Sequence, residues 1–124
     1  MEIIPFGIYP MKKEKTKYQN YYRLFFRREI PERFSWKIGQ KFSLSLNKNK
    51  DLLLQPINLE LLKKYSKNPQ KDLEIIDLRD TKTSPGNVYI EIPERMIKEI
   101  KPKKGQRFSF WGLGNNRLLI TKIP

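Results

Sequence analysis

The sequence predicts a mainly β protein with short helices, in which one structural unit occurs twice. Three short blocks recur in the same order along the chain, which chance does not readily explain. The offset between copies is 62 residues at the first block and 66 at the other two, and four residues make about one α-helical turn. We therefore expect a short helix after the first block, one turn longer in the second copy. The blocks are Ile-Pro-Glu-Arg at 30–33 and 92–95, Gly-Gln at 39–40 and 105–106, and a Leu-rich segment at 51–54 and 117–120.

The first copy is predicted to fold as a strand, a short helix and a hairpin. Residues 21–30 are rich in aromatic side chains, which is typical of a strand. Pro31 cannot donate to a strand ladder but suits the start of a helix, so the strand should end at Ile30 and a helix of about two turns should follow. Alternation over 41–46, a polar turn and a return at 51–55 then predict a β-hairpin, with Ser43 on its outward face.

The N-terminal residues 1–20 change character part-way. They begin apolar, with Pro5 and Pro10, which favours an edge strand because proline interrupts a central one. The lysines that follow indicate a solvated hairpin arm or loop, with a frayed basic tail as the alternative.

The second copy repeats the plan after a joining segment. Residues 57–67 carry apolar side chains at helical spacing, and Pro69 should stop that helix. Apolar residues over 73–78 predict a strand that pairs with the one at 88–92. The helix over 96–100 and the hairpin of strands around 108–110 and 118–120 then follow, joined by a turn in which Asn115 and Asn116 are turn formers.

Composition narrows the function classes. The 26 basic residues exceed the 13 acidic ones and leave a net charge of +13, a field that attracts polyanions. Nucleic acid is the favoured partner, and a merely solubilising surface is the alternative. The chain has no Cys and no His, so the usual metal ligands and the usual neutral-pH general base are missing. We expect no enzyme activity, no catalytic residues, no metal site and no cofactor.

The order of strand, Ile-Pro, helix, Lys-x-Gly-Gln turn, alternating strand, polar turn and Leu-rich strand resembles the swapped-hairpin DNA-binding domain of the AbrB/MazE/SpoVT superfamily. The likeness covers about residues 21–56 and 73–124, and the stretch 92–106 is the closer match. The superfamily usually has an acidic residue after the glycine, where this chain has Gln40 and Gln106. Its two copies, from two chains, exchange hairpins to build one barrel, and in the tandem MraZ-like members one chain supplies both copies.

The resemblance implies two swapped-hairpin (AbrB-like) repeats fused into one pseudo-twofold barrel. It divides the chain into a first repeat with a basic arm over 1–56, a linker helix over 57–72 and a second repeat over 73–124. One copy alone has too few strands to cover its apolar face, which favours a fused pair. The expected assembly is a monomeric pseudo-dimer or a homodimer.

The leading functional hypothesis is a DNA-binding protein that acts as a transcription regulator. Arginine-rich strands and loops of the first repeat would contact phosphates and major-groove base edges of double-stranded DNA. The candidate DNA-binding residues are Arg23, Arg27, Arg28 and Arg33, then Lys12, Lys13, Lys15 and Lys17 on the preceding arm, and Arg79, Lys82 and Arg95 in the second copy.

Several alternatives remain open. They are a nonspecific chromatin or virion nucleic-acid-coating protein, an antitoxin-like protein-interaction module, and an RNA binder whose aromatic side chains stack on bases. No apolar run is long enough to cross a membrane, so no membrane partner is expected. The expected location is cytoplasmic, in association with the nucleoid.

Overall fold

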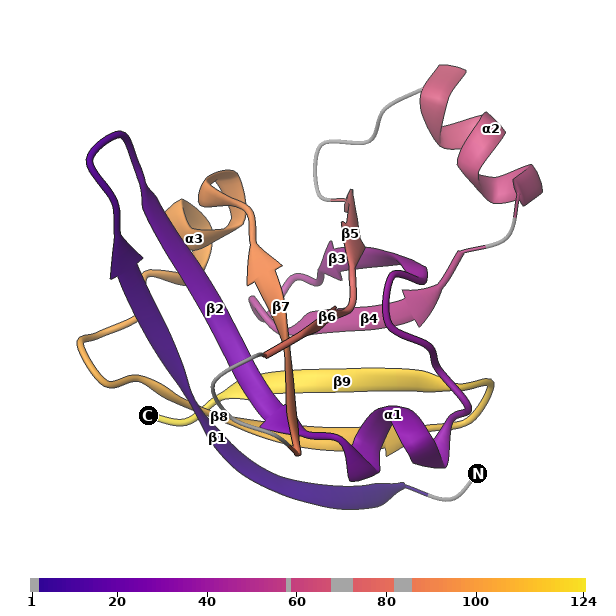
Figure 1. Ribbon diagram of the computed structural model, residues 1–124, viewed down its shortest axis with the longest axis horizontal. Coiled ribbons are helices and arrows are strands. Elements are labelled where there is room, and N and C mark those ends of the chain that lie inside the picture. The colour runs from indigo at the N-terminus through magenta and orange to yellow at the C-terminus, as the bar shows by residue number, and fades with distance from the viewer. Residues whose placement is uncertain (1–2, 58, 68–72, 82–85) are drawn as a thin grey trace.

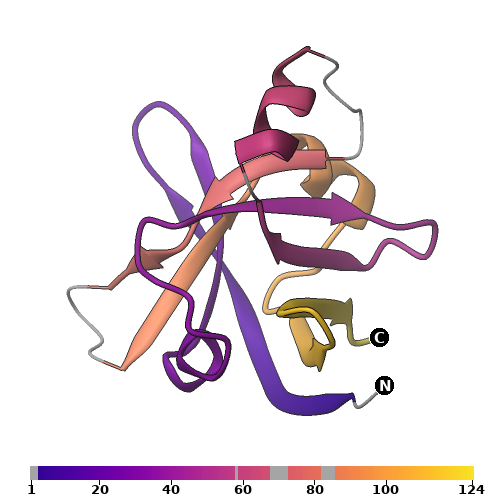
Figure 2. The same ribbon diagram turned by 90° about the vertical axis from the view of Figure 1, so that its right-hand side faces the viewer.

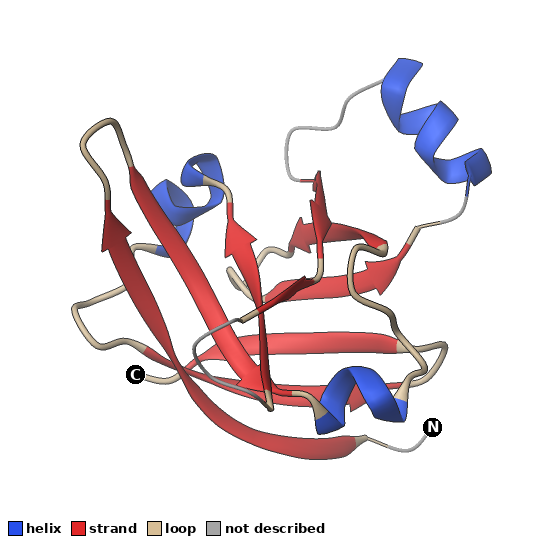
Figure 3. Cartoon of the chain, viewed as in Figure 1, coloured by secondary structure: helices blue, strands red, loops and turns tan. Residues whose placement is uncertain are grey.

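The computed structural model describes residues 3–57, 59–67, 73–81 and 86–124. These residues form nine strands and three short helices (Figures 1 and 3), which confirms the mainly β class. The strands are β1 (Ile4–Lys15), β2 (Asn20–Arg27), β3 (Lys41–Leu46), β4 (Leu52–Pro56), β5 (Leu73–Asp77), β6 (Arg79–Asp80), β7 (Asn87–Ile92), β8 (Arg107–Leu113) and β9 (Arg117–Lys122). The helices are α1 (Glu29–Arg33), α2 (Leu59–Lys67) and α3 (Glu94–Ile100).

The strands form one antiparallel sheet that curls into a nearly closed barrel (Figure 2). Its strand order is β5-β3-β4-β9-β8-β1-β2-β7-β6. The strands at the two ends of this order, β5 and β6, are separated in the chain only by Leu78. One bent strand therefore pairs with β3 before Leu78 and with β7 after it, and so joins the two ends of the sheet.

β1 changes partner in the same way. It pairs with β8 from Ile4 to Pro10 and with β2 from Met11 to Lys15. Because each half of β1 has a ladder on one side only, a proline whose missing N–H faces the unpaired side removes no ladder bond. A strand with Pro5 and Pro10 can therefore be part of the barrel. Each half of β1 is an edge strand on its unpaired side, in agreement with the edge strand expected from the prolines.

The barrel interior is filled by the alternating apolar side chains of both hairpins and of β2 and β7. Phe26, Phe42, Phe108 and Phe110 are among the fully buried side chains, as their inward positions in the sequence pattern predict. Ser43 was expected to face outward to solvent, but it is also fully buried, in a cross-strand row between Gln55 of β4 and Ile75 of β5. Helices α1 and α3 lie at opposite ends of the barrel (Figure 1).

Two sequence predictions about element boundaries were wrong. β2 ends at Arg27, not Ile30, and α1 begins at Glu29, so that Pro31 lies inside its first turn. Proline is tolerated there because the first N–H groups of a helix have no intrahelical acceptor. In the second copy Pro93 stands just ahead of α3, as predicted, and α3 is longer than α1 by two residues, not by a full turn.

The partner of the strand at 73–78 also differs from the prediction. β5 pairs with β3, and only its continuation β6 pairs with β7. The apolar pattern identified the strand, but a pattern of alternation carries no information on which neighbour lies beside it. The predicted pairing with β7 is therefore made by Arg79 and Asp80, which follow the apolar residues of the pattern.

Candidate nucleic-acid interface

Beyond Met11, β1 leaves β8 and continues with β2 as a two-stranded ribbon, which we call the arm (residues 11–24) (Figure 1). Five pairs hold its strands in register, from Met11 opposite Leu24 to Lys15 opposite Asn20. At the base of the arm Met11 and Leu24 are buried in the core and residues 22–24 also pair with β7, whereas the lysine side chains of β1 and of the turn are not covered by core. The arm therefore exposes four lysines to solvent: Lys12, Lys13, Lys15 and Lys17.

The loop between α3 and β8 is held in a defined shape. Gly105 has a φ of 72°, and the side-chain oxygen of Gln106 accepts a hydrogen bond from the backbone N–H of Lys103 at 3.3 Å. The amide nitrogen of Gln106 donates to the carbonyl of Ile123 at 2.6 Å, which fixes the loop to the end of β9. Lys103 and Lys104 are exposed on this hydrogen-bonded turn.

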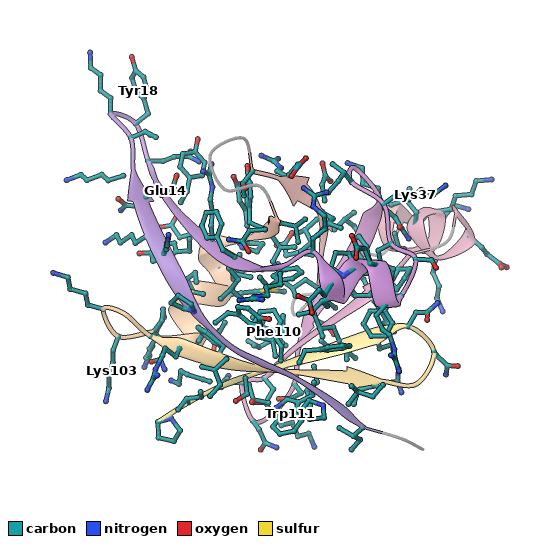
Figure 4. All side chains as sticks on the ribbon, turned by 60° about the horizontal axis from the view of Figure 1, so that its bottom comes forward. Glu14, Tyr18, Lys37, Lys103, Phe110 and Trp111 are labelled. Atoms are coloured by element: carbon teal, nitrogen blue, oxygen red, sulfur yellow. The ribbon has the colours of Figure 1, made fainter. Side chains whose placement is uncertain are left out.

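A hollow of about 630 Å³ lies between the arm and this loop, and we call it the lysine groove. Lys103 points away from the body of the molecule on the same side as the tip of the arm (Figure 4). The one acidic lining residue, Glu14, is ion-paired with Arg23 at 2.6 Å, so its charge is compensated. The lining residues are Met11, Lys12, Lys13, Glu14, Tyr22, Pro102, Lys103, Lys104 and Gly105.

Arg23 forms ion pairs within the protein that hold the arm to the barrel. Its guanidinium contacts Glu14 of β1 and Glu91 of β7, at 2.6 and 3.0 Å, and lies over the rings of Tyr21 and Tyr89. Burial by itself would lower the pKa of Arg23, but the hydrogen bond to Glu91 and the charges of both carboxylates outweigh it and raise that pKa. Arg23 thus ties three adjacent strands together at the base of the arm.

The other predicted arginines are spread over the molecule. Arg28 is ion-paired with Asp80, and Arg79 lies 3.4 Å from Glu91. Arg95 is 2.8 Å from Glu74. Together with Arg27, four of the predicted arginines besides Arg23 therefore have carboxylate partners.

Arg27 and Arg33 are the exposed members of the predicted arginine cluster. Arg27 is 3.6 Å from Glu29, an exposed pair, and Arg33 ends α1. Both lie near the end of β2 that is opposite the arm, so the structure does not bring them to the lysine groove. Lys82 lies outside the described residues.

The residues that sequence reasoning missed are Lys103 and Lys104. The signal was present, because residues 101–104 hold three lysines in four positions. That segment was interpreted as the turn before a strand, and its charge was not connected with the lysines of the arm, some ninety residues earlier. Only the pairing of β1 with β8 places the two segments side by side.

No protein family model, no curated protein and no solved structure matches this chain. In the part of the chain that the structure describes, no three acidic, His or Cys side chains form a group that could hold a metal ion. Among the same residues, no helix has the length and apolar character needed to cross a membrane.

Proposed function

We propose that this protein binds nucleic acid, with the lysine groove as its phosphate-binding surface, and that it acts as a DNA-binding regulator. The observation that carries the proposal is that Lys12, Lys13, Lys103 and Lys104, from two distant segments, all line one hollow. A cluster of like charges from distant segments opposes folding through mutual repulsion, and a polyanion relieves it. Each lysine that neutralises a phosphate also releases counterions, which favours binding at low salt.

The shape of the arm supports duplex DNA as the first partner to test. A two-stranded β-ribbon fits the major groove, which is about 12 Å wide. With the arm in or along that groove, the lysines of the loop would meet the adjacent backbone. Contacts to phosphates orient a protein on the duplex but read no sequence, so base-specific reading would fall to side chains of the arm.

We also propose that the chain is a tandem of two swapped-hairpin repeats. The strand pairing supports this, since each hairpin lies against the first strand of the other half: β3 against β5, and β8 against β1. Equivalent strands also pair with each other, β2 with β7 and β4 with β9. The Gly-Gln turns agree as well, because the side-chain oxygen of Gln40 accepts from the N–H of Lys37 at 2.9 Å, as that of Gln106 does from Lys103.

Within this proposal the register changes one correspondence between the copies. Ile76 pairs with Phe42 as Tyr9 pairs with Phe108, which makes Met11 equivalent to Leu78. Met11 lies opposite Leu24, and the register of β6 with β7 places Leu78 opposite Ile90, so Leu24 corresponds to Ile90. β2 and β7 therefore correspond at an offset of 66, and Arg23 matches Tyr89. Relative to its preceding strand, the Ile-Pro block of the first copy therefore lies four residues, about one helical turn, further along the chain than that of the second copy. This agrees with the position of Pro31 inside α1 and of Pro93 ahead of α3.

The test of the nucleic-acid proposal is a titration of a 20-base-pair duplex, followed by fluorescence anisotropy at several salt concentrations. The double variant Lys103→Ala/Lys104→Ala should bind more weakly and should lower the log–log salt slope by about 1.8, since each phosphate contact contributes about 0.9. The matched control is Lys63→Ala/Lys64→Ala, two adjacent exposed lysines of α2 with the same loss of charge. A flat salt response of the unmodified protein, or equal losses in both variants, contradicts the proposal.

A selection from a pool of random duplexes separates a regulator from a protein that coats chromatin. A regulator associated with the nucleoid should prefer some sequences in a pool of random duplexes, whereas a coating protein should bind all members alike. Enrichment of one sequence class after selection from such a pool supports the regulator.

A further inference from the structure

The tip of the arm presents an aromatic side chain to solvent. Tyr18 is 88% exposed, the most exposed large apolar side chain among the described residues (Figure 4). Turn tips favour Gly, Asn, Asp and Ser, whereas an exposed ring adds nothing to the fold. The other exposed large apolar residues are Ile3, Ile8 and Ile38, and none of them belongs to the tip. Tyr18 is therefore not part of an apolar patch of the kind that binds a protein partner.

The turn that carries Tyr18 is held by its own hydrogen bonds. The backbone N–H of Thr16 donates to the carbonyl of Gln19 at 2.9 Å, and the Thr16 hydroxyl donates to the same carbonyl at 3.0 Å. That hydroxyl also accepts from the backbone N–H of Gln19 at 3.2 Å. Because the turn is closed, Lys17 and Tyr18 are presented together, with the Lys17 ammonium 5.8 Å from the Tyr18 ring centre.

Cations continue from the lysine groove to this tip. Lys13 lines the groove and lies 5.7 Å from the ring centre of Tyr22, and Lys15 and Lys17 follow along the arm. A positively charged track that ends on an aromatic ring is how proteins hold single strands: the charges follow the phosphates and the ring stacks on a base. In a fully paired duplex every base face except those of the two terminal pairs is covered by a neighbouring base pair, so a ring finds few faces on which to stack.

We propose that Tyr18 stacks on an unpaired nucleobase, so that the arm recognises single-stranded nucleic acid or the unpaired end of a duplex. This inference rests on the proposed function, because the lysine groove supplies the phosphate contacts. The ring provides a π-face and every base has one, so the contact selects for strandedness and not for sequence. Stacking contacts of this kind are worth about tenfold in affinity on removal of the ring.

The experiment measures binding of a 20-nucleotide DNA, the RNA of the same sequence and the corresponding duplex to the unmodified protein and three variants at one salt concentration. Tyr18→Ala should weaken binding of the single strands by about tenfold and leave duplex binding within about twofold. Tyr18→Phe should bind like the unmodified protein, because stacking needs the ring and not the hydroxyl. Ile8→Ala is the control for loss of an exposed apolar side chain away from the tip, and it should change neither.

A direct measurement uses Tyr18→Trp, whose added indole fluorescence should be quenched by the single strand and not by the duplex. An equal loss on duplex, no loss with Tyr18→Ala, or the same loss with Tyr18→Phe overturns the inference. If Tyr18→Ala binds normally while Lys103→Ala/Lys104→Ala does not, the stacking inference fails and the proposed function stands. If neither strand form binds the unmodified protein, both fail. Tighter binding of the single-stranded DNA or of the single-stranded RNA shows which nucleic acid supplies the base.

Discussion

At the scale of single residues, the glutamines of the two Gly-Gln turns, Gln106 and Gln40, have different environments. Gln106 is only 8% exposed, and its amide nitrogen donates to the carbonyls of Arg107 and Ile123. A carboxylate has no hydrogen to donate, and it would face two carbonyl oxygens. Gln40 differs, because its side chain is less buried and its oxygen accepts from the N–H of Lys37, which a carboxylate does equally well.

We therefore predict effects of different size for the same substitution in the two copies. Gln106→Glu should lower the free energy of unfolding by about 1–3 kcal/mol, because buried carbonyls lose their donor. Gln40→Glu should change it by less than about 0.5 kcal/mol. Urea denaturation of both variants at neutral pH measures the difference, and equal destabilisation would show that the two turns are held in another way.

At the scale of elements, the arm depends on an ion network at its base. Arg23 of β2 bridges Glu14 of β1 and Glu91 of β7, and Arg79 of β6 also approaches Glu91. Four strands are thus connected on the outer face, at the point where the ribbon leaves the barrel. We expect this network to fix the direction in which the arm, and with it the lysine groove, is presented.

Arg23→Lys tests this role because it keeps the charge and loses the fork that reaches both carboxylates. We expect faster amide hydrogen exchange in residues 11–15 and 20–24, unchanged exchange in the β8–β9 hairpin, and a stability loss of about 1 kcal/mol. The control is Arg28→Lys, which affects a single ion pair away from the arm. If hydrogen exchange changes uniformly across the barrel, or does not change in the arm, Arg23 does not hold the arm in place.

The elements also show how far sequence reasoning reaches. Alternation and turn residues predicted both hairpins, because those signals are local: Asn115 and Asn116 do have positive φ, and Phe42 and Phe108 are inside. The position of α1 was missed because proline fits several places in a first turn. The lysine groove was missed for a different reason: it depends on which strand lies beside β8, and that choice is made by tertiary pairing.

At the scale of the whole molecule, each half of the chain lacks a closed sheet of its own. Residues 1–56 contain β1 to β4, but in the structure β3 pairs with β5 and β8 pairs with β1. A half expressed alone would leave strand edges and the apolar side of both hairpin strands uncovered.

We predict that residues 1–72 and 73–124, expressed separately, are each unfolded or self-associated, and that mixing them restores the circular dichroism spectrum and the thermal transition of the full chain. Light scattering should then report one complex with the mass of the full chain. A fragment 1–72 that folds as a stable monomer would contradict the mutual dependence of the halves, and the tandem-repeat proposal with it.

The bent strand through Leu78 has a consequence for the order in which the protein forms. It joins the two ends of the sheet and lies near the middle of the chain, whereas the β8–β9 hairpin with which β1 pairs is made later. During synthesis, the strands of residues 1–56 must therefore remain incompletely paired until β8 and β9 have left the ribosome. Contacts so distant in sequence close slowly, and the basic arm emerges well before the surface that completes its groove.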